Sequence, residues 1–478
     1  MKRLLIWTLS LSILAVSCGR VYEAGGRAPL AYDCAGTTLP VNIAPLNFAL
    51  ADSLAVSHVS AVCSYEGKSY SGSESLSIRK WRKLLSEAVG NDIAVTITAK
   101  VQGKWMKYDP FTIHIAEDRI DPYILYRLVE PGYETWNRMG IYQRCLEDFT
   151  QTPVVENRLT GYGCVNCHSL QSYNPERMLF HSRVECGGTY IYTDGKLEKY
   201  DTKTPETISA LVYPQWNPVA DFAIFSVNST KQLFHTSSAN RIEVFDYTSD
   251  VVVCDMSTHT LLDCPLLKQR GIFETFPTFS PEGDRIFFCS ADSVAMPENY
   301  DKVRYSLCSI AFNPADGSFG DVVDTLYNAR KEGRSVSFPR VSPDGDKIMF
   351  ILSGYGNFSI WHKDADLYIA NLNDGSIDEA EALNSDDVES YHSWSSNGRW
   401  VIFSSRRHDK LYTRLYIAYV DTDGICHKPF ILPQKQSSFY NSLLKSYNIP
   451  EFSSGRISLS PHKVRLAAKS NPEHLQTL

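Results

Sequence analysis

The stretch FPRVSPDGDKIMFILS, residues 338–353, holds an aromatic approach, a tight turn and an alternating strand in immediate succession. In the turn S-P-D-G, proline fixes φ and glycine supplies a positive φ at little steric cost. The residues after the turn alternate in the way that predicts a β-strand. This stretch therefore predicts two strands joined by a short turn.

The same pattern recurs along the chain, at spacings of about 53 to 63 residues, which suits one four-stranded propeller blade plus its loops. A second strand follows the hairpin in several copies, for example DLYIANLNDGS at 366–376. Weaker copies bring the number of repeats to six. Besides 338–353, the copies are 172–183, 213–226, 276–290, 391–405 and 458–470.

The region 120–158 looks like a pair of strands without the repeat motif, and the last copy ends close to the C-terminus. We expect these N-terminal strands to complete the last blade, because an open ring would leave an exposed strand edge. The predicted fold class is all-β, a six-bladed β-propeller preceded by a small β-sandwich-like domain. The expected boundaries are a signal peptide at 1–17, a lipidated tether at 18–36, the small domain at 37–117 and the propeller at 118–478.

The small domain is predicted from runs with period-two alternation, such as AVTITAK and FTIHIA. One amphipathic stretch, SIRKWRKLLSEAV at 77–89, is expected to form a helix. No cluster of titratable residues in this part of the sequence suggests catalysis.

The N-terminus has the form of an export signal, with Lys2 and Arg3 ahead of an apolar run. The run ends in Ala-Val-Ser-Cys18, which resembles a bacterial lipobox and implies lipidation of Cys18. A plain signal peptide with a nearby cysteine is the alternative. Gly19 in place of aspartate favours the outer membrane, with the protein facing the periplasm.

Charge and cysteine content narrow the function classes. The formal net charge is −7, which does not suggest a nucleic-acid surface. The twelve cysteines suit an exported, oxidising location. Two pairs, Cys254 with Cys264 and Cys289 with Cys308, lie where either a cross-strand disulfide or two buried free thiols is expected.

A C-x-x-C-H motif formed by Cys164, Cys167 and His168 is the sharpest chemical signal. This spacing suits covalent attachment of a c-type haem, with His168 as the proximal iron ligand. A disulfide or exposed thiol pair is one alternative. A zinc site is another, although structural zinc takes four ligands and no second pair of this spacing supplies them.

The sixth iron ligand would decide the chemistry of such a haem, since methionine suits electron transfer and an open position favours small-ligand binding. Four side chains are candidates, and each also has an ordinary interpretation as a packed strand residue. They are Met139, Met178, His181 and His392.

The segments FSPEGDRIFF and VSPDGDKIMF resemble the repeat of TolB-like β-propellers, and the resemblance covers about residues 172–470. It is looser in the copies at 213–226 and 391–405 and weakest at 458–470. A lipobox, a sandwich-like domain, C-x-x-C-H and this propeller together look like a group of Bacteroidetes-type lipoproteins. The resemblance implies a fold and says little about function.

Three functions are compatible with these features of the sequence. The first is a lipid-anchored periplasmic c-type cytochrome that binds haem iron, exchanges electrons or senses redox state, and docks a redox or envelope protein. The second is a TolB-like protein- or glycan-binding envelope scaffold without haem. The third is a propeller enzyme, which we place last because no catalytic constellation is readable.

Overall fold

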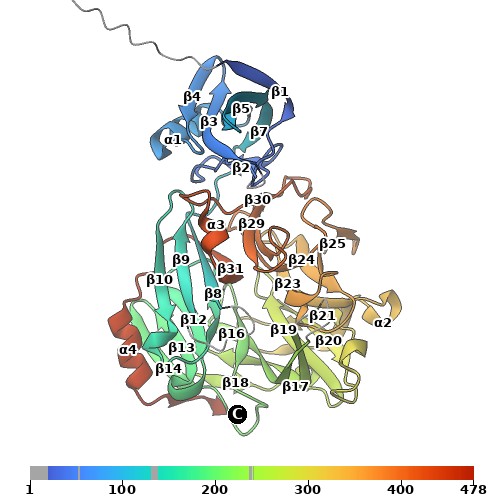
Figure 1. Ribbon diagram of the computed structural model, residues 1–478. Coiled ribbons are helices and arrows are strands. Elements are labelled where there is room, and N and C mark those ends of the chain that lie inside the picture. Colours follow the sequence, from blue (N-terminus) through green and yellow to red (C-terminus); the bar gives the residue numbers. More distant parts are fainter. Residues whose placement is uncertain (1–19, 52–53, 131–137, 236–239, 241, 478) are drawn as a thin grey trace, which may run out of the picture.

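The computed structural model describes residues 20–51, 54–130, 138–235, 240 and 242–477. It contains a small N-terminal domain and a propeller of six sheets, as Figure 1 shows. The all-β, six-bladed prediction is therefore confirmed. Cys18 and its lipobox lie outside the described residues.

The small domain is one connected seven-stranded sheet with a single α-helix packed against it. The strand order is β1-β6-β5-β3-β4, and β7 joins β5 to β2. Its elements are β1 (Val21–Arg27), β2 (Thr38–Pro40), β3 (Val56–Tyr65), β4 (Lys68–Gly72), α1 (Ile78–Glu87), β5 (Asp92–Val101), β6 (Lys104–Asp109) and β7 (Phe111–Ala116).

Two segments of this domain, α1 and β1, can be compared with the sequence predictions. The expected helix at 77–89 forms as α1, and Trp81, Leu84 and Leu85 lie on its buried face. Residues 21–27, inside the segment expected to be a tether, instead form the exposed strand β1, which pairs in parallel with β6.

Each propeller blade is a mainly antiparallel sheet whose first strand lies nearest the axis. The first blade consists of β31 (Ser446–Ser453), β8 (Tyr123–Val129), β9 (Gly140–Cys145) and β10 (Gln151–Glu156). The second consists of β11 (Val165–Leu170), β12 (Arg177–Ser182), β13 (Gly188–Thr193), β14 (Lys196–Asp201) and β32 (Glu473–His474). The third consists of β15 (Val212–Trp216), β16 (Phe222–Phe234), β17 (Ile242–Asp255), β18 (Thr260–Leu262) and β33 (Gln476–Thr477).

The remaining three blades have four strands each. The fourth consists of β19 (Ile272–Phe279), β20 (Arg285–Asp292), β21 (Ser306–Phe312) and β22 (Phe319–Tyr327). The fifth consists of β23 (Ser335–Val341), β24 (Lys347–Ser353), β25 (Asp366–Asn371) and β26 (Ile377–Glu379). The sixth consists of β27 (Glu389–Trp394), β28 (Trp400–Ser405), β29 (Arg414–Tyr419) and β30 (Phe430–Ile431). Short helices are α2 (Ala329–Glu332), α3 (Phe439–Ser442) and α4 (Pro461–Lys469).

The ring closes in the first blade, where the C-terminal strand β31 pairs antiparallel with β8. Figure 1 shows the two lying side by side although they are far apart in sequence. The copy expected at 458–470 is wrong as a strand, because residues 461–469 form α4. Ser460 caps this helix by accepting a hydrogen bond from Lys463 N, and Pro461 occupies its first turn, so the Ser-Pro pair starts a helix here.

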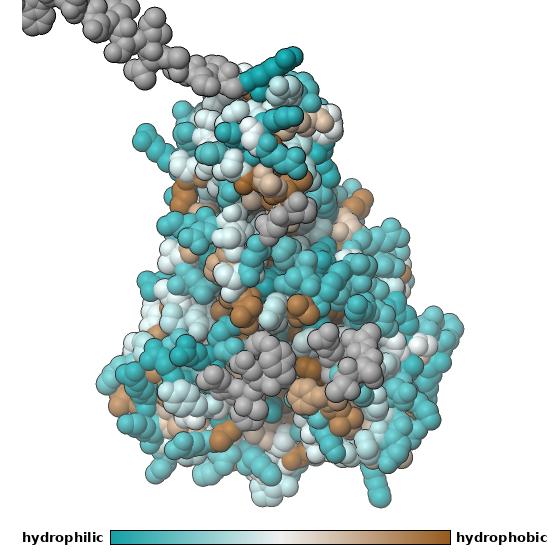
Figure 2. Space-filling model, viewed as in Figure 1, coloured by the Kyte–Doolittle hydropathy of each residue, from teal (hydrophilic) through white to brown (hydrophobic). Residues whose placement is uncertain are grey.

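The small domain is packed firmly onto the propeller. One hydrophobic cluster contains Trp81 of α1 together with Trp400 and Leu415 of the sixth blade. Polar contacts add to it, for example between Thr38 Oγ1 of β2 and His427 Nδ1 of the propeller at 2.9 Å. Figure 2 shows a mostly hydrophilic surface on both parts in this view. Within the described ranges, none of the helices has the length and apolar composition needed to cross a bilayer.

The cysteines that the structure describes are free thiols, so neither candidate pair forms a disulfide. Cys289 lies opposite Leu307, whereas Cys308 lies opposite Phe288. This one-residue offset points the two side chains to opposite faces of the sheet. Cys254 and Cys264 are likewise assigned to two different hydrophobic clusters.

Candidate binding funnel at the propeller axis

Every blade carries the same backbone irregularity on its innermost strand. At one position the strand has positive φ, between 39° and 56° in the six residues concerned, and its register with the neighbouring strand shifts. We call these residues the left-handed ring. Its members, in blade order, are Ile449, Cys167, Tyr213, Phe276, Phe338 and Tyr391.

Aromatic members of the left-handed ring close the axial channel. Neighbouring rings lie 4.6 Å apart for Tyr213 and Phe276, 4.2 Å for Phe276 and Phe338, and 4.2 Å for Phe338 and Tyr391, measured between centroids. The space left beside Cys167 and the aromatic residues is only about 20 Å³, roughly enough for one water molecule.

Each member of the left-handed ring begins a four-residue pattern that all six blades repeat. The tetrapeptides are IPEF at 449–452, CHSL at 167–170, YPQW at 213–216, FPTF at 276–279, FPRV at 338–341 and YHSW at 391–394. The second position is proline or histidine, the third is polar and the fourth is apolar. The second half of the C-x-x-C-H motif is thus this blade's copy of a strand that all six blades share.

The third position of each tetrapeptide is polar in all six blades, and we call this set the polar ring. Five of its members border a cavity of about 300 Å³, the axial funnel, on one face of the propeller. The sixth, Ser169, is buried. The five that line the funnel are Glu451, Gln215, Thr278, Arg340 and Ser393.

Several polar atoms at the funnel lack a hydrogen-bond partner among the described residues. They include the Glu451 Oε2 and Ser393 Oγ atoms, which are buried from solvent. The Gln215 and Thr278 side chains also make no hydrogen bond to a described residue. Such unmet capacity costs about 1–3 kcal/mol per buried group, so a concave site that collects it is suited to a polar ligand.

His168 lies at the wall of this funnel, as part of β11. Its side chain is fully buried, and neither ring nitrogen has a partner of normal geometry among the described residues. Burial, reinforced by the Arg127 charge and partly opposed by the main chain of Ile449, lowers its pKa to about 3. The imidazole is therefore neutral at physiological pH.

The candidate distal ligands separate into different environments. His392 lines the same funnel as His168, and its Nε2 donates to the Met349 carbonyl at 2.9 Å. Met178 is fully buried in the core between blades. His181 borders a separate cavity and lies 3.2 Å from the Thr189 hydroxyl. Met139 lies beside Arg127.

A covalent haem needs both thiols and His168 to meet one porphyrin. Cys167 and His168 both border the 20 Å³ space, which is too small for a porphyrin, and His168 alone also borders the funnel. The Cys164 Sγ atom instead accepts a hydrogen bond from Arg127 Nη2 at 3.3 Å, and the same nitrogen lies 3.5 Å from the Met139 sulfur. The imidazole fits an iron ligand, whereas the space beside the thiols does not fit a porphyrin.

The other interpretations of the motif are also constrained. Cys164 and Cys167 are free and not joined as a disulfide. In the part of the chain that the structure describes, no three histidine, cysteine or acidic side chains converge as a metal site would require.

Sequence reasoning found His168 and His392 but missed the polar ring. The signal was present in YPQW, FPTF, FPRV and YHSW, where one polar letter stands between apolar ones. Its meaning depended on knowing that all of these strands face one axis.

Known proteins resemble this chain in structure and not in sequence family. No family model and no curated protein matches the chain. Among solved structures, the β-propeller domain of the trilobed protease from Pyrococcus furiosus is 12% identical with a TM-score of 0.33, covering 72% of this chain and 90% of that one. The periplasmic gluconolactonase of Pseudomonas aeruginosa is 11% identical with a TM-score of 0.36, covering 65% and 97%.

Proposed function

We propose that the protein is an envelope-anchored binding protein that holds a small ligand in the axial funnel, against the polar ring. The observation that carries this proposal is the polar side chain at the same position in all six blades, five of them bordering one cavity. Positions on either side are mostly apolar or proline, so the polarity is confined to the axis. Concave sites with a few convergent polar groups are the usual form of small-molecule sites.

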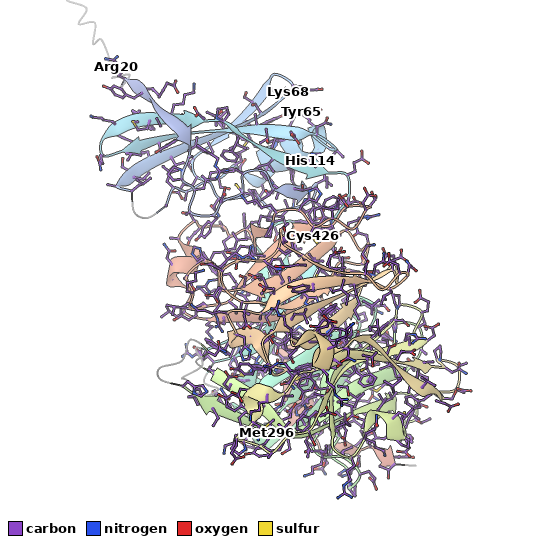
Figure 3. The ribbon with its side chains drawn as sticks, turned by 90° about the vertical axis from the view of Figure 1, so that its right-hand side faces the viewer. Arg20, Tyr65, Lys68, His114, Met296 and Cys426 are labelled. Carbon is purple, nitrogen blue, oxygen red and sulfur yellow. The ribbon has the colours of Figure 1, made fainter. Side chains whose placement is uncertain are left out.

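The anchor follows from the N-terminal sequence and remains a proposal, as does its place in the outer membrane facing the periplasm. Lipidation of Cys18 would hold the chain at a membrane. Figure 3 supports a spacer role for the small domain, because Arg20 lies at its outer end and Met296 lies at the opposite end of the molecule. The propeller would then stand away from the bilayer, where a ligand or an envelope protein can approach.

The test is ligand-observed saturation-transfer NMR on the full chain in detergent, with indole, benzamide, benzoate and glucose as probes. Thr278→Trp fills the funnel, and Thr325→Trp places the same side chain on the exposed outer strand of the same blade. We expect at least one probe to show transfer with the wild type and Thr325→Trp but not with Thr278→Trp. Equal transfer in both variants, or none with any protein, would contradict the proposal.

Covalent haem is the second candidate, favoured by one observation: the buried, neutral and unpartnered imidazole of His168. The visible spectrum and a haem-stained denaturing gel test it, using protein made in cells that ligate a control cytochrome. A cytochrome would show a reduced α-band and a stained band, both lost in Cys164→Ala/Cys167→Ala and kept in Cys289→Ala/Cys308→Ala. Colourless wild-type protein would exclude haem and leave the binding scaffold.

A further inference from the structure

The charge inventory of the funnel is short. Arg340 and Glu451 are the only arginine, lysine or acidic side chains among the described residues that border it. The histidines at its wall, His168 and His392, both have their pKa lowered to about 3 by burial and are neutral. The charge that a ligand meets is therefore set by one guanidinium and one carboxyl group.

Arg340 is largely uncommitted. Its Nη1 donates to the Pro339 carbonyl at 2.7 Å, and this is the one hydrogen bond that the guanidinium makes to a described residue. A guanidinium has five N–H donors in a planar fork, so most of them remain for a ligand. The Arg340 side chain is partly buried, and this burial lowers its pKa, while Glu451 opposes part of the shift.

Glu451 is not paired with Arg340, since no ion pair or hydrogen bond joins these two side chains among the described residues. One oxygen of Glu451 accepts the Leu170 N–H at 2.9 Å, and the other lies 4.0 Å from His168 Nε2 without a hydrogen bond. The guanidinium therefore remains open to a ligand.

Building on the proposed function, we propose that the funnel ligand is a small carboxylate, whose charged group binds Arg340 while its apolar body lies against the proline and aromatic wall. A planar fork matches a carboxylate with two parallel hydrogen bonds. A single cation balances a single negative charge, which favours a monoanion over a phosphate dianion. The wall that would receive the apolar part consists of Tyr173, Pro218, Phe279, Pro281 and Pro343.

The experiment compares benzoate with benzamide, which has nearly the same shape and no charge, by titration of the full chain. We expect benzoate to bind the wild type about tenfold or more tightly, because hydrogen bonds to charged groups are the stronger ones. Arg340→Gln should remove the difference. Arg285→Gln is the matched control, since Arg285 pairs with the exposed Asp324 and does not border the funnel.

Two outcomes would overturn the inference in distinguishable ways. If benzamide binds as well as benzoate and Arg340→Gln changes neither, the funnel binds ligands but does not select an anion. If neither compound binds any of the proteins, the binding function fails together with its charge selectivity. Far-ultraviolet circular dichroism of each variant separates lost binding from lost folding.

Discussion

The second and sixth blades place a histidine at the same point of the same tetrapeptide, CHSL and YHSW, yet the two side chains differ in their surroundings. His168 and His392 are each 3% exposed, and burial lowers both pKa values to about 3. His392 donates to the Met349 carbonyl, whereas His168 makes no hydrogen bond to a described residue. The two side chains are equally buried but differ in hydrogen bonding, so His392 has a structural role and His168 is available to a ligand.

The preceding residue differs as well. In the sixth blade it is Tyr391, which packs on Phe338 as part of the aromatic closure of the channel. In the second blade it is Cys167, a much smaller side chain. The aromatic row thus runs from the third blade to the sixth, and the C-x-x-C-H motif lies in the part of the ring where it is interrupted.

The aromatic side of the ring should dominate stability. Phe338 is 2% exposed and packs between two other rings, so Phe338→Ala should lower the free energy of unfolding by about 3–5 kcal/mol. Cys167→Ala removes one sulfur atom and should cost about 1 kcal/mol. Urea unfolding followed by tryptophan fluorescence measures both. Equal losses would mean that the channel is not closed mainly by its aromatic residues.

Glu451 should make stability depend on pH. Its pKa is raised from the ordinary value to about 8 in the folded chain, so the unfolded chain releases its proton first. The stabilisation is complete below about pH 4.5 and is lost as the pH rises to about 8. Relative to Glu451→Gln, the wild type should therefore lose a few kcal/mol across this window and then level off. A constant difference between the two proteins would contradict this prediction.

The two histidines should respond oppositely to removal of their nitrogens. His392→Leu leaves the Met349 carbonyl without this donor and should cost about 1 kcal/mol. His168→Leu removes two buried nitrogens that have no partner and should be neutral or slightly stabilising. Thermal unfolding in the absence of ligand gives the comparison. A large loss from His168→Leu would reveal a structural partner for this ring.

Gln215 offers the smallest effect on stability. Its side chain borders the funnel and makes no hydrogen bond to a described residue, so Gln215→Ala should change the free energy of unfolding by less than about 0.5 kcal/mol. Probe binding in the funnel should weaken nevertheless. Unchanged probe binding by this variant would show that Gln215 does not contact the ligand. The roles of Arg340 and Glu451 are tested by their own variants.

Local chemistry made most of the blades predictable. The S-P-D-G and S-P-E-G turns are specified by proline and glycine themselves, and the strand β24 that follows the first of them forms as expected. The copy at 458–470 failed because a Ser-Pro pair without glycine also starts a helix. The innermost strand β31 went unrecognised because it precedes a Ser-Ser-Gly segment that lacks the repeat turn.

The amino-acid sequence was enough to predict an all-β chain with a repeated hairpin, because turn residues and alternation act between near neighbours. It also marked His168, Cys164 and Cys167 as a unit through their spacing. The different environments of Cys164, which contacts Arg127, and of His168, which borders the funnel, arise in the folded chain, because the strand irregularity at Cys167 changes the direction of the chain between them. When the ring closes, polar residues that are about 50 to 60 positions apart in the sequence come together around one axis. Pairing between distant strands causes this convergence, so no local property of the residues could predict it.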